Sequence, residues 1–370
     1  MSDIVFILGA GASKECGGPL MQEFLEVADE IRLRGSIEEQ FLKAIDTALA
    51  ARNALQIVHS KSQLDLDNIE SILGTFEMSK TLGVMPGDIG KSIDEVLESI
   101  RTLITVTLEE SIWYGRGQKS YEKHTKPVDV LVPDGGYREL SDLLRTILET
   151  DKPKRSVSII TFNYDLAADV ALLYQQIQPQ YFLDDTDPQN GIPLLKLHGS
   201  TNWAACPTHK QVVPWRIVDY LNSGNGKRMF SSKDRVHRLK IGSDILTGRF
   251  NHCGDGVATE PFLVPPTANK VAYHETIERV WRRAAQELRE AVYIIVVGYS
   301  MPETDVFFKH LYAIGTAGGR PLKSFVCVNS DYKVHERFKA MLGLDAIKKF
   351  SSVNGPFSNA NRDIKRCLNI

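Results

Sequence analysis

The 370-residue sequence lacks the features that mark several large classes of protein. Its 44 basic residues nearly balance its 46 acidic ones, so no overall positive charge is available to hold a nucleic acid. The five cysteines are odd in number and widely spaced, which does not fit a disulfide framework. No apolar stretch approaches the ~20 residues that span a membrane, and Ile4 to Leu8 is too short for a signal peptide. We therefore expect a reduced, cytoplasmic, soluble protein.

Five short apolar runs are present instead, and they predict buried parallel strands because none alternates with polar residues. The runs are Ile4 to Leu8, Ser156 to Phe162, Ile192 to Leu197, Val292 to Val297 and Ser324 to Val328. A turn-forming or polar residue follows each run: Gly9, Asn163, His198, Gly298 and Asn329. Ligands of open α/β sheets bind at the carboxyl ends of the strands, so these residues predict one functional edge.

The first two runs are separated by far more chain than the dozen or so residues that a crossover needs. Helical periodicity fills most of this gap. It predicts helices at Met21 to Leu33, Ile37 to Ala51, Leu66 to Glu77, Ile93 to Trp113 and Leu140 to Leu148. Two more helices are predicted on either side of the Val292 strand, at Glu275 to Glu290 and Glu303 to Ile314.

Lys119 to Gly136 and Cys206 to Pro266 show turn signals without periodicity and are expected to be irregular. The predicted fold class is therefore α/β, with a Rossmann-like doubly wound parallel sheet and an inserted helical domain. We assign the sheet to residues 1–18 and 151–370 and the insertion to residues 19–150, in keeping with two domains for a chain of this length.

The segment Gly9-Ala10-Gly11-Ala12-Ser13 directly follows the first predicted strand. Two glycines allow a tight turn and a close approach of the backbone to a phosphate, which the start of a helix also favours. The usual dinucleotide-binding pattern would place a third glycine at position 14, where this chain has Lys14. A tight turn without any ligand explains the motif equally well.

Two further strand ends carry side chains that suit catalysis. In Thr161-Phe162-Asn163-Tyr164-Asp165, the amide of Asn163 could bind ribose hydroxyls or a water. Asn163 could equally be a turn residue, and Asp165 could cap a helix that begins at Leu166. In Lys196-Leu197-His198-Gly199-Ser200, the imidazole of His198 titrates near neutral pH and can act as a base.

The last two strand ends suit binding. Val297 to Asp305 places Ser300 just after Gly298, where a hydroxyl or a backbone N–H could bind a phosphate or a ribose. Glu303 and Asp305 favour the start of a helix there. Asn329 offers a hydrogen-bonding side chain at the final strand end. All of these residues could also be purely structural.

Taken in order, GAGAS, TFNYD, LHGS, VGYS and VN resemble the motifs of the sirtuin superfamily. The resemblance covers the predicted α/β core and reaches neither the helical insertion nor the C-terminal end. It implies that the chain binds NAD. The resemblance assigns the NAD phosphates to Gly9, Ala10, Gly11 and Ser13, the nicotinamide-ribose site to Asn163, Asp165 and His198, and the adenosine side to Gly298, Ser300 and Asn329.

The chain also departs from the protein deacylases of that family. It lacks their two Cys-x-x-Cys pairs and their Phe-Gly-Glu segment, in whose place Leu263 to Thr267 stands. Gly17-Gly18-Pro19-Leu20 replaces their Pro-x-Phe-Arg pattern. These departures resemble the prokaryotic sirtuin-like branch that hydrolyses NAD in anti-phage defence. That resemblance implies an NAD+ glycohydrolase (NADase) that forms nicotinamide and ADP-ribose, assembles as a homo-oligomer and acts with a partner such as a DNA-translocase-type ATPase.

Two other functions stay open. The first is an NAD-dependent protein deacylase, which would need a peptide groove for which we see no residues. The second is a non-catalytic sensor of NAD or ADP-ribose that acts through assembly. Nicotinamide release without any acylated peptide would distinguish the hydrolase from both.

A zinc site is the remaining alternative to weigh. Cys206 and His209 have the spacing of zinc ligands, and His252 or Cys253 could complete a site. However, adjacent residues rarely both ligate, and the chain between the two pairs is long. No metal is therefore expected, and NAD as a substrate is the one small molecule predicted.

Overall fold

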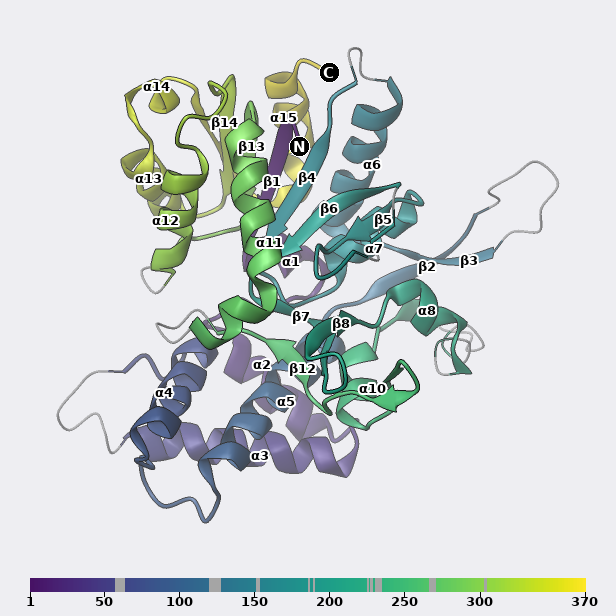
Figure 1. Ribbon diagram of the computed structural model, residues 1–370, viewed down its shortest axis with the longest axis vertical. Helices are drawn as coiled ribbons and strands as arrows, with labels where there is room; N and C mark the ends of the chain where they lie inside the picture. The colour runs from purple at the N-terminus through teal and green to yellow at the C-terminus, as the bar shows by residue number, and fades with distance from the viewer. Residues whose placement is uncertain are drawn as a thin grey trace.

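The computed structural model describes residues 1–56, 64–119, 128–150, 154–185, 187–188, 190–224, 226, 229, 235–265, 271–302 and 305–370. Within these residues, a sheet of seven parallel strands has the order β15-β14-β13-β1-β4-β6-β5 (Figure 1). The strands are β1 (Ile4–Leu8), β4 (Val157–Thr161), β5 (Gln178–Gln180), β6 (Gly191–Lys196), β13 (Tyr293–Val297), β14 (Ser324–Asn329) and β15 (Phe350–Asn354).

The central strands form because their side chains are apolar on both faces. Every residue of β1, β4 and β13 is buried, and aliphatic residues dominate all three. The α/β class and the five predicted strands are thus confirmed. Two strands, β5 and β15, were not predicted, and they are the two edges of the sheet. Edge strands are half solvated, and the residues Gln-Pro-Gln and Phe-Ser-Ser-Val-Asn give little apolar signal.

The chain order of the strands places a topological switch point beside β1. From β1 the chain adds β4 and β6 on one side, and it later returns to add β13, β14 and β15 on the other. Leu8 is level with Thr161 of β4 and with Val297 of β13, so the three strands end together. Such a point in a doubly wound sheet opens a crevice where ligands bind.

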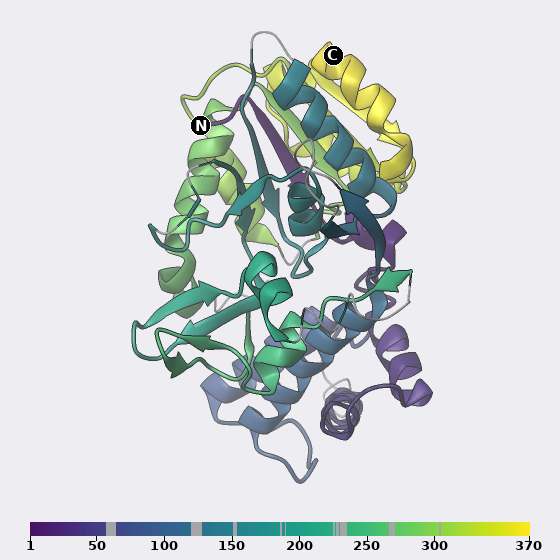
Figure 2. The same ribbon diagram turned by 90° about the vertical axis from the view of Figure 1, so that its right-hand side faces the viewer.

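Helices cover both faces of the sheet (Figure 2). Helices α6 (Gly135–Thr150) and α15 (Asn361–Leu368) lie on one face, and α11 (Val271–Glu290) and α12 (Val306–Gly315) lie on the other. The start predicted for α12, Glu303, lies outside the described residues. The shorter elements are α1 (Ala10–Ser13), η1 (Lys14–Cys16), α7 (Ala167–Tyr174), α13 (Tyr332–Met341), α14 (Leu344–Ile347) and η3 (Phe357–Asn359).

A group of helices lies beyond the carboxyl edge of the sheet, at the bottom of Figure 1. It contains α2 (Phe24–Arg34), α3 (Glu39–Ala54), α4 (Ile69–Leu82) and α5 (Ile93–Ser111), each within a few residues of its predicted bounds. Helix α5 begins with a capping box, in which Ser92 and Glu95 each bond the backbone N–H of the other. Helix α6 packs against α7 and α15 beside the main sheet, and the domain division at residue 150 stays a prediction.

The expectation of irregular structure at Lys119 to Gly136 and Cys206 to Pro266 is wrong. In the first segment, β2 (Tyr114–Lys119) and β3 (Val128–Val132) form an antiparallel hairpin that β9 (Val236–His237) extends. In the second, β7 (Gly199–Cys206), β8 (Gln211–Pro214) and β12 (Pro261–Leu263) form a three-stranded sheet. It also contains α8 (Ile217–Asn222), α10 (Ile241–Leu246), β10 (Asn251–His252) and β11 (Asp255–Gly256). Such short elements give no measurable periodicity. Residues 120–127 and Pro266 lie outside the described part.

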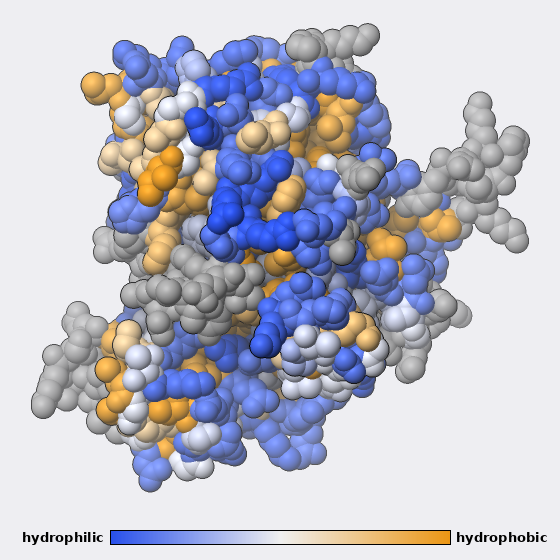
Figure 3. All heavy atoms as spheres, viewed as in Figure 1, coloured by the Kyte–Doolittle hydropathy of each residue, from blue (hydrophilic) through white to orange (hydrophobic). Residues whose placement is uncertain are grey.

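Among the described residues, no helix has the length and apolar character needed to cross a membrane. The surface is mixed, and apolar area gathers over the helical group at the lower left of Figure 3. Leu33, Met78, Leu82 and Val84 of this group are exposed. Apolar surface of this kind is a natural place to look for contacts with another protein.

Candidate functional site

The glycine turn lies at the switch point, pressed against the turn that follows β13. A Cβ atom on Gly9 would lie 2.4 Å from the Cα atom of Tyr299. Gly298 has a φ of +62°, and a Cβ atom there would lie 2.1 Å from the nitrogen of Ala12. Only glycine fits at positions 9 and 298, so the close approach of these two turns explains both residues.

The backbone of the glycine turn is bonded within the protein in this conformation. The Gly9 N–H donates to Val297 O at 3.0 Å, and the Gly11 N–H donates to Gly298 O at 2.9 Å. Ala10 begins the four-residue helix α1, so it contributes little helix dipole. A phosphate bound here would have to use other groups of the turn or displace the Gly298 carbonyl.

Four buried side chains form what we call the serine cluster: Ser13, Tyr137, Asn163 and Asp165. The Ser13 hydroxyl donates to Asp165 Oδ2 at 2.7 Å and lies 3.1 Å from the Tyr137 hydroxyl. The Asn163 amide donates to Ser13 Oγ at 3.0 Å and to Gly9 O at 2.9 Å. These bonds use both amide hydrogens of Asn163, so its carbonyl oxygen is the atom it can present to a ligand.

Asp165 combines a structural bond with an unusual environment. Its Oδ1 accepts from the Ala167 N–H at 2.9 Å at the start of α7, one residue later than the start predicted at Leu166. Burial raises the pKa of Asp165, while the nearby Lys196 charge and the Ser13 hydroxyl act in the opposite direction. The same carboxylate therefore supports the helix with one oxygen and the serine cluster with the other.

A second group of side chains forms what we call the histidine cluster. It contains Phe162, His198, Tyr299 and Asp305. His198 Nε2 lies 4.0 Å from Asp305 Oδ2, and the Tyr299 hydroxyl donates to the same oxygen at 2.5 Å. The Phe162 ring stacks on Tyr299 at 4.3 Å and meets the His198 ring edge-on at 5.1 Å. His198 is 3% exposed, so a ligand reaches it only if neighbouring side chains move.

Two residues predicted for the adenosine side lie apart from these clusters. Ser300 is exposed just after the β13 turn. Asn329 ends β14, and its Oδ1 accepts from the Asp331 N–H at 2.9 Å, so it shapes the turn into α13. Both stay predictions as ligand contacts, and neither touches the serine or histidine cluster through a bond that the structure records.

Four residues of the two clusters were not predicted from the sequence: Tyr137, Phe162, Tyr299 and Asp305. Tyr137 comes from α6, which follows none of the five strands predicted from the sequence, and no local signal marked it. Asp305 is part of the VGYSMPETD segment, but it was interpreted only as a helix start. It does precede α12, yet its side chain makes no bond to the first backbone N–H groups of that helix.

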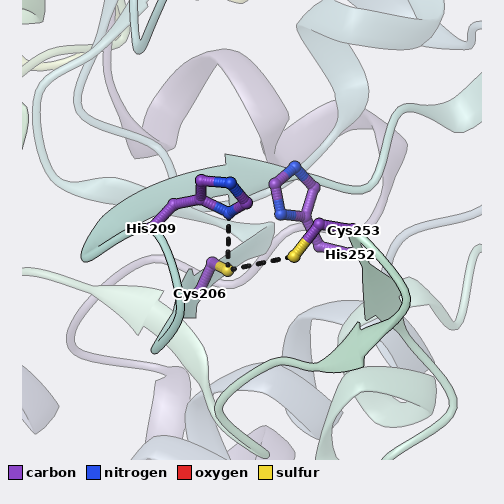
Figure 4. Close-up of side chains that lie close together, drawn as sticks. All are labelled: Cys206, His209, His252 and Cys253. Atoms are coloured by element: carbon purple, nitrogen blue, oxygen red, sulfur yellow. Dashed lines mark hydrogen bonds between the residues drawn. The ribbon is translucent and has the colours of Figure 1, made fainter.

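A third cluster bears on the expectation that no metal is bound. Cys206, His209, His252 and Cys253 offer four ligand atoms that all lie within 4.8 Å of one another (Figure 4). Cys206 Sγ lies 3.5 Å from His209 Nδ1 and 3.9 Å from Cys253 Sγ. Tetrahedral zinc, with Zn–S of about 2.3 Å and Zn–N of about 2.1 Å, separates such atoms by about 3.6 and 3.8 Å.

Backbone geometry explains why adjacent residues can both point into this cluster. His252 ends β10, and Cys253 has a φ of +52°, a conformation that is rare outside glycine. Together they turn both side chains toward Cys206 and His209 (Figure 4). Hydrogen bonds from the His209 backbone and then its side chain lower the pKa of Cys206 to about 6, which favours the thiolate that binds metals. The residues fit a zinc ion.

The path of the chain is similar to that of solved Sir2 proteins. A Sir2 homologue mutant in complex with ADP ribose has 14% identity and a TM-score of 0.43, over 99% of this chain and 91% of that chain. Sir2 with a p53 peptide and NAD+ has 14% identity and a TM-score of 0.38, over 99% and 93%. No family model and no curated protein matches the chain. What the site does therefore follows from its own geometry.

Proposed function

We propose that the chain is an NAD+ glycohydrolase that cleaves the bond between nicotinamide and ribose. One observation carries the proposal. Ser13, Asn163 and Asp165 come together at the switch point of a parallel sheet, and His198 closely follows the neighbouring strand β6. Crevices at such points bind nucleotides. The Sir2 structures solved with ADP ribose or NAD+ make NAD the nucleotide to test first.

The reaction needs little covalent chemistry from the protein. Water attacks the anomeric carbon of the nicotinamide ribose, and the C–N bond breaks with its electron pair passing to the nicotinamide nitrogen. That pair neutralises the pyridinium, which is a good leaving group. The water loses a proton, and the products are nicotinamide, ADP-ribose and H⁺. The protein must orient the ribose, exclude bulk water and accept that proton.

Each role has a residue suited to it. The carbonyl oxygen of Asn163 would accept from a ribose hydroxyl or the attacking water, because both of its amide hydrogens are used within the protein. Neutral His198 would accept the proton, and general-base help of this kind contributes about 10²–10⁴-fold. Asp165 would hold Ser13, and through it Asn163, in place.

Zinc would have a structural role in this scheme. Bound by Cys206, His209, His252 and Cys253, it would tie the β7–β8 turn to the β10–β11 turn. A site filled by four protein ligands has no open position for substrate, so zinc would stabilise the fold and take no part in the chemistry.

Assembly and partners belong to the same proposal. A homo-oligomer would use the exposed apolar surface of the helical group, and an ATPase partner of the DNA-translocase type would supply the trigger in anti-phage defence. The burial of His198 supports an enzyme that is slow until its site opens.

The test is a time course of purified protein with NAD that resolves nicotinamide, ADP-ribose and cyclic products. Release of nicotinamide without any acylated peptide supports the hydrolase. Release only when an acyl-lysine peptide is added identifies a deacylase instead. Tight NAD binding without release under any condition identifies a sensor.

A further inference from the structure

The carboxylate of Asp305 lies beside His198 and does not cap the helix that it precedes. Asp305 occupies the N-cap position of α12, where an aspartate side chain normally accepts from backbone N–H groups of the first turn. Here it makes no such bond. It is 1% exposed and turns instead toward the Tyr299 hydroxyl and His198. Leaving a cap unmade while burying a carboxylate costs free energy, so the orientation needs another explanation.

The surroundings hold this carboxylate and the imidazole in fixed positions. The Tyr299 hydroxyl binds Asp305 Oδ2, and the Tyr299 ring is stacked on Phe162. Phe162 in turn meets the His198 ring edge-on. On the other side, the backbone of His198 is fixed by the bond from the Val264 N–H to its carbonyl at 2.8 Å. Neither Asp305 nor His198 can move far without disturbing this packing.

We propose that Asp305 is a positioning residue for His198, whose carboxylate orients the imidazole and stabilises positive charge on it. The inference deepens the hydrolase proposal and rests on it. At 4.0 Å in a site closed to water, an ionised carboxylate favours the imidazolium that forms when His198 takes a proton. Tyr299 would act indirectly. Its hydrogen bond would hold Asp305 in place and would partly neutralise the negative charge of the carboxylate.

Other titratable groups near His198 could also affect its pKa, so the experiment needs control variants for them. The Tyr164 ring lies 6.1 Å from the imidazole, and burial followed by the carboxylate of Glu70 raises the pKa of Tyr164 well above its ordinary value. Burial and then Asp305 do the same to Tyr299. Both tyrosines are therefore neutral over the working range. Among the described residues, the carboxylates that act on these two tyrosines are Asp305, Glu70 and Glu77.

The test is an NMR titration of the His198 imidazole in three variants of the full chain. In Asp305→Asn the pKa of His198 should fall by about 1–3 units, because a nearby negative charge is lost. In Tyr299→Phe it should rise by a fraction of a unit, because Asp305 loses a hydrogen bond that drew charge from it. Glu70→Gln should shift it less than Asp305→Asn does.

A fall in the pKa of His198 in Asp305→Asn together with a rise in Tyr299→Phe identifies an electrostatic role. If Asp305 and Tyr299 had only a structural role, the two variants would shift this pKa in the same direction or not at all. An unchanged pKa in Asp305→Asn overturns the inference. If that variant does not fold, Tyr299→Phe decides alone: a rise supports the inference, and no change or a fall contradicts it. The titration needs no turnover, so it stands even if NAD is not hydrolysed. Where turnover is present, Asp305→Asn should lower kcat near pH 7 and leave KM unchanged.

Discussion

A buried ion pair beneath the site allows a sharp test of how this fold is held together. Lys196 of β6 and Asp169 of α7 are both fully buried, with Nζ 3.0 Å from Oδ2. Lys196 also donates to the main-chain oxygen of Asp165, and the Tyr181 hydroxyl donates to the other oxygen of Asp169. Every charge here is paired, and the pair connects β6, which His198 follows, to α7, which Asp165 precedes.

Replacing Lys196 with methionine keeps the side chain long and apolar but removes its charge. Asp169 then lacks its charged partner in the core, with Tyr181 as its one remaining donor among the contacts described. Removing one partner of a buried pair typically costs about 3–5 kcal/mol. We expect Lys196→Met to lower the free energy of unfolding by about that amount, measured by urea unfolding at pH 7 with far-UV circular dichroism.

Two further variants make the result specific. Lys196→Met combined with Asp169→Asn removes both charges and should regain at least about half of the loss, because buried pairs replaced together are often neutral. Lys309→Met makes the same change on the exposed side of α12 and should stay within about 0.5 kcal/mol of the original protein. A loss below about 1 kcal/mol in Lys196→Met would refute the reasoning.

Two more predictions concern the metal and the pH dependence. Cys206→Ser should reduce bound zinc, measured by elemental analysis, from one equivalent per chain to nearly none. The control Cys367→Ser should leave bound zinc unchanged. Equal amounts of zinc in both variants would show that the cluster does not bind it. Burial raises the pKa of Glu109 to about 8. Because the folded chain keeps this proton and the unfolded chain loses it near pH 4.5, the free energy of unfolding should fall by about 3 kcal/mol between pH 5 and pH 8. This part of the slope should vanish in Glu109→Gln and persist in Glu98→Gln.

The sequence predicted the framework of the fold because that framework depends on burial. Strands such as Ile4–Leu8 and Tyr293–Val297 are apolar throughout, and helices such as Ile93–Ser111 carry both periodicity and a cap. Edge strands and the small antiparallel sheets were missed because their strands are short or mix polar and apolar residues without a clear alternation. Their formation depends on partners that are far away in the chain.

The candidate site also contains residues that could be predicted from the sequence and residues that could not. Residues at strand ends, such as Ser13, Asn163 and His198, could be found because parallel strands bring their carboxyl ends to one edge. Tyr137 and the orientation of Asp305 could not, since each depends on packing between separate elements. The candidate metal cluster of Cys206, His209, His252 and Cys253 was not predicted for a local reason. The left-handed backbone at Cys253, which lets adjacent residues point into one cluster, leaves no mark in the spacing of these residues.

The central claim is that His198 acts as the base in NAD hydrolysis, and nicotinamide release tests it most directly. His198→Ala should be compared with His310→Ala, which makes the same change at an exposed histidine on α12, after both are shown to fold like the original protein. We expect release to fall about 10²–10⁴-fold in His198→Ala and to be unchanged in His310→Ala. Release at the original rate by folded His198→Ala would contradict it.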